Sequence, residues 1–84
     1  MSYTLVFSRE FSKEVANLDK PVRERIQKAV DRLRETPTLG KPLTGILAGR
    51  WSLRAGDYRI LYRIHHHELI VLLLTVGHRR EVYK

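Results

Sequence analysis

The chain has 84 residues, enough for one small domain, and a chain of this size buries only about 60% of the surface that it exposes when unfolded. It contains no cysteine, which excludes disulfides, thiolate metal sites and a cysteine nucleophile. Sixteen lysines and arginines against nine acidic residues give a formal net charge of +7, which favours a polyanionic partner.

The N-terminal part of the chain predicts a strand followed by a helical hairpin. Residues 2–7 place Tyr3, Leu5 and Phe7 on one side, as a half-buried strand requires. Ser8 is a suitable N-cap for a first helix, and Pro21 begins a second, which Pro37 ends. The apolar stripes of the two helices are Phe11, Val15 and Leu18, then Val22, Ile26, Ala29, Val30 and Leu33.

The C-terminal half predicts a loop and then a run of strands. Residues 37–49 are expected to be a loop, because two prolines and three glycines occur in thirteen positions. Strands are expected at residues 50–54, 58–64 and 69–76, with a polar turn at 65–68. The last strand is apolar on both faces, which suits a central strand covered on both sides, and Gly77 is expected to end it.

This order of elements predicts an α+β fold for a single domain over residues 1–84. The N-terminal strand and the helical hairpin should pack on an antiparallel β-sheet. The first strand must pair within the later strands, because a lone strand leaves its backbone unpaired. Tyr58 and Tyr62 should face the helices, whereas Arg59 and Arg63 should lie on the other face, which is expected to be concave and partly open.

No membrane segment is expected. The longest apolar run, at residues 69–76, is too short to span a bilayer, which needs about 20 residues. The N-terminus has no charged segment followed by an apolar stretch and a cleavage site. A cytoplasmic location is therefore the expectation.

The three consecutive histidines at residues 65–67 raise the question of a metal site. Successive strand residues point to opposite faces, so only His65 and His67 could share an ion, and no nearby cysteine or paired carboxylate completes the site. A polar turn is the simpler interpretation. We expect no metal and no cofactor.

Basic and aromatic side chains in the C-terminal half indicate a nucleic-acid site. A guanidinium can hold two phosphate oxygens, and aromatic rings stack on unpaired bases. Arg59 is the most informative, because an arginine in mid-strand beside Leu61 costs sheet packing unless it has a function. Trp51 is more simply a core or rim residue. The basic candidates are Arg50, Arg54, Arg59, Arg63, Arg79, Arg80 and Lys84, and the aromatic ones are Trp51, Tyr58, Tyr62, His78 and Tyr83.

These groups suit a metal-free cleavage of RNA. The ribose 2′-hydroxyl attacks the adjacent phosphorus and leaves a 2′,3′-cyclic phosphate and a free 5′-hydroxyl. The reaction needs a proton acceptor, positive charge near the phosphorane and a proton donor for the leaving oxygen. The arginines can supply the charge, and His78 and Tyr83 are both candidates for the proton transfers.

The sequence also resembles the RelE/ParE superfamily of toxins from bacterial and archaeal toxin–antitoxin operons. The similarity covers nearly the whole chain. It rests on the order of the elements and on three segments, residues 40–43 (GKPL), 56–64 (GDYRILYRI) and 76–83 (VGHRREVY).

The resemblance implies a RelE-type mRNA interferase, which enters the ribosomal A site, cuts the mRNA there and stops translation. By position it implies Arg59, Arg79 and Tyr83 as catalytic residues, with Arg80 as the alternative match to Arg79. It matches Arg50 and Arg54 to basic residues of the preceding strand, where Ser52 replaces the lysine of some relatives. His78 stands where other members have lysine, which makes it a candidate base. The proposed RNA-binding residues are Arg50, Arg54, Arg63 and Arg80.

The resemblance further implies partners. These are a RelB-like cognate antitoxin, the ribosome with its mRNA, and operator DNA bound only through the antitoxin complex. An amphipathic antitoxin helix with acidic residues could lie on the exposed basic or apolar surface. Two other functions stay open, a gyrase-poisoning toxin of the ParE branch and a non-catalytic module that binds RNA or antitoxin.

Overall fold

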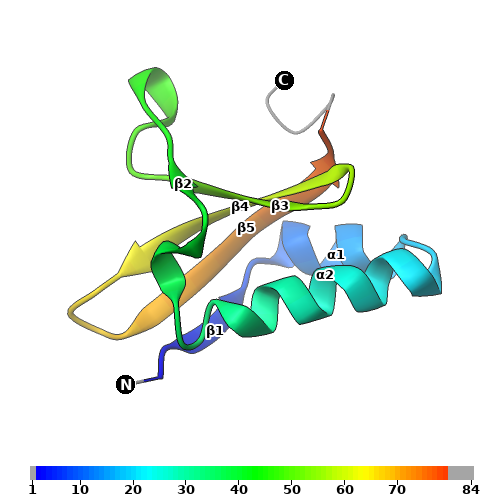
Figure 1. Cartoon of the computed structure of the whole chain (residues 1–84), viewed down its shortest axis with the longest axis horizontal. Helices are drawn as coiled ribbons and strands as arrows, with labels where there is room; N and C mark the ends of the chain where they lie inside the picture. Colours follow the sequence, from blue (N-terminus) through cyan, green and yellow to red (C-terminus); the bar gives the residue numbers. More distant parts are fainter. Residues whose placement is uncertain (1, 80–84) are drawn as a thin grey trace.

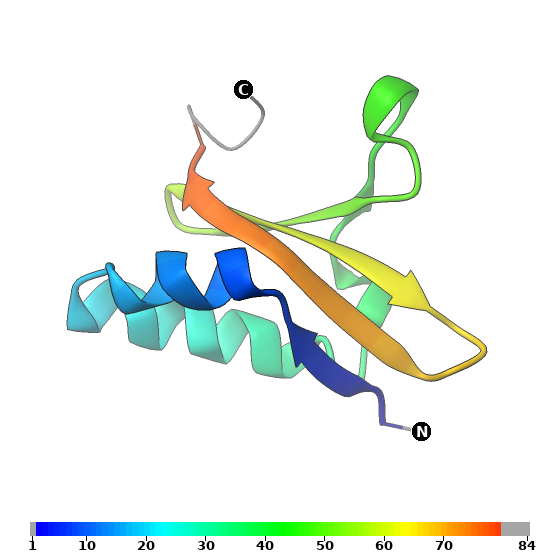
Figure 2. The same cartoon turned by 180° about the vertical axis from the view of Figure 1, so that it is seen from behind.

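The computed structural model describes residues 2–79, which form two helices packed on one face of a five-stranded sheet (Figures 1 and 2). The strands are β1 (Thr4–Phe7), β2 (Lys41–Pro42), β3 (Trp51–Ala55), β4 (Tyr58–His65) and β5 (Ile70–His78). The helices are α1 (Arg9–Ala16) and α2 (Lys20–Arg32), and two short 3₁₀ turns are η1 (Pro37–Leu39) and η2 (Gly45–Leu47). None of the helices in the described range is long and apolar enough to cross a membrane.

The strand order is β1-β5-β4-β3-β2, so the first and last strands in sequence lie side by side. The predicted α+β fold is confirmed, and so is the pairing of the first strand within the later ones. Strands β2 to β5 are antiparallel, as expected, whereas β1 joins β5 in parallel and makes the sheet mixed. The alternation of side chains along β1 predicts a buried face but does not specify the direction of its neighbour.

The core lies between the helices and the sheet. The Ser8 hydroxyl accepts from the Phe11 amide at 3.0 Å and caps α1, and Pro21 lies in the first turn of α2, both as predicted. The side chains that are almost completely buried come from α2, the residue after it and strands β4 and β5: Ile26, Val30, Leu33, Ile60, Tyr62, Val71 and Leu73.

Tyr62 is the one phenol in this buried set, and its hydroxyl both donates and accepts a hydrogen bond. It donates to the Pro37 carbonyl at 2.7 Å and accepts from the Gly40 amide at 3.0 Å. Burial raises the pKa of Tyr62 above its usual value of 10.0, against a smaller lowering by the Gly40 amide. A Cβ on Gly40 would lie 2.5 Å from the Ser52 carbonyl oxygen and 2.7 Å from the Tyr62 hydroxyl, so this position accepts only glycine.

Three expectations for the strands are wrong. The loop at residues 37–49 contains the short strand β2, which pairs with β3. Gly77 does not end β5, because Gly77 pairs with Arg59 and His78 pairs with Tyr58. Strand β5 is covered on one face only, since the helices lie on the other side from Leu72 and Leu74, which stay half-buried.

Candidate nucleic-acid interface

The sheet face that points away from the helices carries most of the predicted basic residues. We call it the open face. Alternation along β4 directs Arg59, Leu61 and Arg63 to this face, while Ile60 and Tyr62 enter the core. The register across β2, β3 and β4 aligns Lys41 with Ser52, Ser52 with Leu61 and Arg54 with Arg59. The basic residues of the open face are therefore Lys41, Arg50, Arg54, Arg59 and Arg63.

Arg54 and Arg59 lie directly opposite each other on neighbouring strands. Like charges in this position destabilise a sheet. The Nε of Arg54 donates to the Gly56 carbonyl at 3.1 Å, and Arg59, which is half-buried, faces Gly77 on its other side. Within residues 2–79 no carboxylate forms an ion pair with either arginine. The pair therefore costs stability and leaves two positive charges for an anion.

Arg79 approaches the same end of the sheet. Its backbone amide donates to the Asp57 carbonyl at 2.8 Å, in the turn between β3 and β4. The Arg54 side chain is hydrogen-bonded to the same turn, through the Gly56 carbonyl. The turn thus brings Arg54, Arg59 and Arg79 into one region. Arg80 and Tyr83, also predicted as site residues, lie outside the described part of the chain.

The side chain of His78 does not lie on the same face of the sheet as that of Arg59. Its register partner is Tyr58, which packs against the core, and the two rings make an edge-to-face contact with centroids 5.9 Å apart. Arg59 instead pairs with Gly77 on the open face. The sheet therefore does not align His78 with Arg59, and the imidazole lies at the end of β5.

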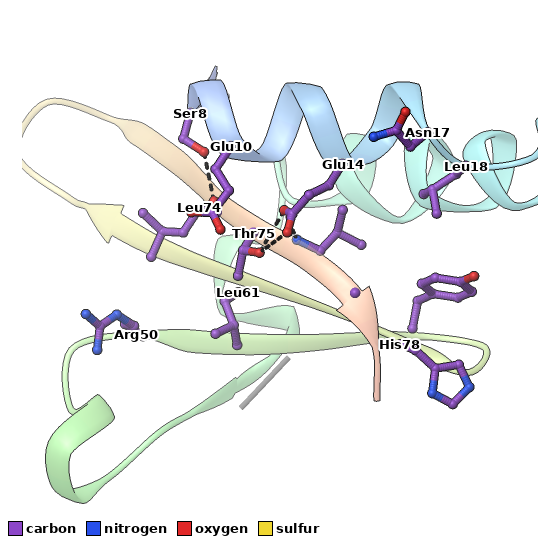
Figure 3. Close-up of a pocket in the computed structure, with 13 residues that line it drawn as sticks. Ser8, Glu10, Glu14, Asn17, Leu18, Arg50, Leu61, Leu74, Thr75 and His78 are labelled. Atoms are coloured by element: carbon purple, nitrogen blue, oxygen red, sulfur yellow. Dashed lines mark hydrogen bonds between the residues drawn. The ribbon is translucent and has the colours of Figure 1, made fainter. Parts of the chain in front are cut away.

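A groove of about 850 Å³ runs along the boundary between α1 and the open face (Figure 3). Leu61, Leu74, Thr75 and Gly77 line it from the sheet, and Arg50 and His78 lie at its opposite ends. The α1 side consists of Ser8, Glu10, Glu14, Asn17 and Leu18.

Glu14 is a structural residue of this groove that the sequence reasoning missed. Its two carboxylate oxygens accept from the Thr75 hydroxyl at 2.7 and 2.8 Å, and one also accepts from the Val76 amide at 2.9 Å (Figure 3). Ser8 donates to the Leu74 carbonyl at 2.8 Å. These side chains replace the backbone partners that β5 loses where β1 ends at Phe7. They hold the part of β5 that leads to Gly77 and Arg79.

Arg50 and Arg63 lie at the other end of the open face, beside the loop that contains η2. Arg50 Nη1 donates to the Ile46 carbonyl at 3.5 Å. The Arg63 guanidinium packs on the same loop, because a Cβ on Gly49 would lie 3.2 Å from Arg63 Nη1. Arg54 and Arg59 therefore lie towards one end of the open face and Arg50 and Arg63 towards the other, while the register places Lys41 between the two pairs.

The remaining aromatic and histidine predictions concern the core and a turn. Trp51 stacks on Tyr62 with ring centroids 6.3 Å apart, so both belong to the core and its rim, as predicted. His66 and His67 lie in the β4–β5 turn, as predicted, whereas His65 is the last residue of β4 and pairs with Ile70. There the Tyr3 hydroxyl and His66 Nδ1 are 3.0 Å apart, and His65 Nδ1 is 3.7 Å from Glu68 Oε2.

Comparison with known proteins gives matches over almost the entire chain. A family model described as the ParE toxin of the type II toxin–antitoxin system parDE matches residues 5–83. Toxin RelG of Mycobacterium tuberculosis is 35% identical over 86 residues, which cover 100% of this chain and 99% of RelG. The mRNA interferase toxin RelE of Escherichia coli is 31% identical over 87 residues, which cover 99% of this chain and 92% of RelE.

Solved structures agree with these sequence matches. The toxin–antitoxin complex RelBE2 from M. tuberculosis contains a chain with a TM-score of 0.87 and 34% identity, covering 94% of this chain and 100% of that one. The isolated RelE toxin of E. coli has a TM-score of 0.78 and 31% identity, covering 98% of this chain and 92% of that one.

Proposed function

This chain belongs to the RelE/ParE superfamily of toxins from type II toxin–antitoxin systems, and on that premise we propose that it is an endoribonuclease that cuts mRNA on the ribosome. The relative from E. coli that is 31% identical is named an mRNA interferase toxin. The observation that carries the proposal is the Arg54–Arg59 pair on the open face, which costs stability and has no carboxylate partner in the described residues.

In the proposed reaction the mRNA strand lies along the open face. The ribose 2′-oxygen forms a bond to the adjacent phosphorus, and the bond from phosphorus to the 5′-oxygen breaks. Arg59, with Arg54 and Arg79 nearby, stabilises the negative charge of the phosphorane. The proton of the 2′-hydroxyl passes to a base, and the leaving oxygen takes up a proton, so the reaction needs no metal or oxidant.

His78 and Tyr83 are the two candidates for these proton transfers. His78 contacts Tyr58 at the end of β5, on the other side of the sheet from Arg59. His78 could therefore transfer a proton only if the mRNA strand passed around the end of β5. Arg50, Arg63 and Arg80 are proposed to bind phosphates on either side of the cut. Phosphate contacts of this kind position a strand rather than read its bases.

We also propose a RelB-like antitoxin as the protein partner. Relatives of this fold form complexes with RelB, as in the M. tuberculosis structure that is 34% identical to this chain. An acidic amphipathic segment would complement the open face, which offers both arginines and the half-buried Leu72 and Leu74. Operator DNA would be bound only through this complex, and a protein that acts on ribosomes would work in the cytoplasm.

Cleavage of mRNA on programmed ribosomes tests the proposal. We expect Arg59→Ala to reduce the cleavage rate by about 100-fold, the usual loss when one stabilising group for a developing anion is removed. Arg23→Ala is the matched control, because Arg23 is an exposed arginine on α2, in the layer behind the sheet. Equal rates for the wild type and Arg59→Ala would remove Arg59 from the site.

The description of the matching family model, a ParE toxin, favours one alternative. In the ParE branch the same fold would poison DNA gyrase and need no nuclease chemistry, because fold does not determine function. Cells that express the chain would then show DNA damage while translation continues. A non-catalytic module would instead bind the ribosome or RNA tightly without cutting it.

A further inference from the structure

The loop between β2 and β3 exposes an isoleucine that the fold does not use. In Figures 1 and 2 the η2 turn stands clear of the sheet and the helices. The Ile46 side chain at this turn is 97% exposed, whereas Phe7 and Val6, the other exposed large apolar residues in the described range, are 44% and 39% exposed. The packing of the core therefore does not explain why residue 46 is an isoleucine.

The loop is nevertheless well defined. The Leu43 amide donates to the Arg50 carbonyl at 2.8 Å and closes its base. Gly45, the first residue of η2, and Gly49, two residues beyond it, have φ angles of 67° and 91°, which only glycine adopts without strain. The hydrogen bonds and the two glycine conformations define the turn that carries Ile46.

The surroundings of Ile46 are positively charged. Arg50 donates to the carbonyl of Ile46 itself, and Arg63 packs on Gly49. The chain carries no acidic residue between Glu35 and Asp57. An apolar side chain beside two arginines suits a nucleic acid, in which bases alternate with phosphates, and isoleucine is among the residues that proteins insert against base steps. Leu43 and Leu47, the other large apolar residues of the loop, are half-buried, so Ile46 offers one apolar contact rather than the row of anchors that a helical protein partner uses.

We propose that Ile46 packs against an RNA base that flanks the cleaved bond, while Arg50 and Arg63 bind the neighbouring phosphates. This inference rests on the proposed function. Arg50 is four residues from Arg54 along the chain, or about 13 Å in an extended strand, so the base that meets Ile46 lies away from the Arg54–Arg59 pair. The contact should therefore strengthen binding without taking part in the chemical step.

The test compares wild type, Ile46→Ala, Ile46→Leu and the control Val22→Ala, in the helix layer away from the open face, on ribosomes programmed with mRNA. It measures kcat, KM and the Kd for the ribosome complex. Removal of the exposed side chain should raise KM and Kd by about five- to tenfold, with kcat within twofold. Ile46→Leu and Val22→Ala should stay within twofold of the wild type. All four proteins should melt at the same temperature within a few degrees, because neither residue is fully buried.

Abasic substitutions in the mRNA identify the base. If one abasic position near the cut makes wild type and Ile46→Ala equal, the base belongs to the mRNA, and the proposal is supported. If the difference persists at every abasic position, Ile46 does not contact an mRNA base, and the proposal is overturned. Equal KM and Kd for wild type and Ile46→Ala would overturn it, and so would a loss confined to antitoxin binding. If the wild type does not cut at all, the proposed function fails, while the Kd values still test the loop.

Discussion

Replacement of Glu14 by alanine tests how α1 supports the end of β5. The substitution removes the acceptor of the Thr75 hydroxyl and the Val76 amide, which lie 2.7–2.9 Å from the carboxylate. A hydrogen bond to a charged group contributes about 1.5–3 kcal/mol when buried. Because Glu14 is half-buried, water can replace part of this, and we expect a loss of about 2 kcal/mol in the free energy of unfolding. For a domain of this size that loss lowers Tm by about 8–16 °C.

The assay combines urea denaturation with hydrogen exchange at the Val76 amide. Glu10→Ala is the matched control, because Glu10 lines the same groove from the same helix and is exposed. A double-mutant cycle with Thr75→Val should give a coupling energy of about 1 kcal/mol. The reasoning is refuted if Glu14→Ala and Glu10→Ala differ by less than about 0.5 kcal/mol, a difference typical of surface substitutions, and the Val76 amide exchanges at the wild-type rate.

Three further predictions concern the core and the open face. Gly40→Ala should lower the free energy of unfolding by about 1–3 kcal/mol, because the new Cβ would lie 2.5 Å from the Ser52 carbonyl oxygen. The Cβ of Gly45→Ala would meet nothing within 4 Å, so comparison of the two Tm values separates overpacking at Gly40 from backbone strain at Gly45. Since the pKa of Tyr62 is raised in the fold, the unfolded chain loses this proton first, so stability should fall as the pH rises above about 10. That fall should be absent in Tyr62→Phe, measured by urea denaturation between about pH 9 and 11. The logarithm of the RNA affinity should fall with the logarithm of salt concentration, with a slope of roughly −0.7 per neutralised phosphate, and Arg59→Ala should reduce that slope by one such step.

Local patterns in the sequence predicted much of the fold. The hydroxyl of Ser8, the position of Pro21 and the alternation from Tyr58 to Ile64 each act on neighbouring residues, so they can be recognised without tertiary information. Strand β2 could not be recognised in this way. It consists of two residues, and its pairing with β3 depends on the close approach of Gly40 to Ser52 across the fold.

The arrangement of the candidate site residues on the sheet was predicted in part for the same reason. Arg59 stood out as a charge in an apolar strand, and its place on the open face follows from simple alternation. The direction of His78 could not be predicted, because the register between β4 and β5 shifts beside Leu61. Strict alternation from Val71 and Leu73 would direct His78 to the open face. The extra residue in β5 reverses this, so Val76 joins the core and His78 meets Tyr58.

Glu14 and Ile46 carried no signal in the sequence. A glutamate on a helix and an isoleucine in a glycine-rich loop are both common. Glu14 gains its role only where β1 ends and leaves the β5 backbone without a neighbour, and Ile46 only where the loop stands clear of the sheet. Both depend on contacts, or on the lack of them, between segments far apart in the chain.

The most direct test of the central claim is to map mRNA ends by primer extension in a reconstituted translation system with the purified protein. We predict cuts inside the codon in the ribosomal A site, with 5′-hydroxyl ends, that form about 100-fold more slowly with Arg59→Ala and at the wild-type rate with Arg23→Ala. Intact mRNA in the presence of the wild-type protein would contradict the claim, whether translation stops or continues.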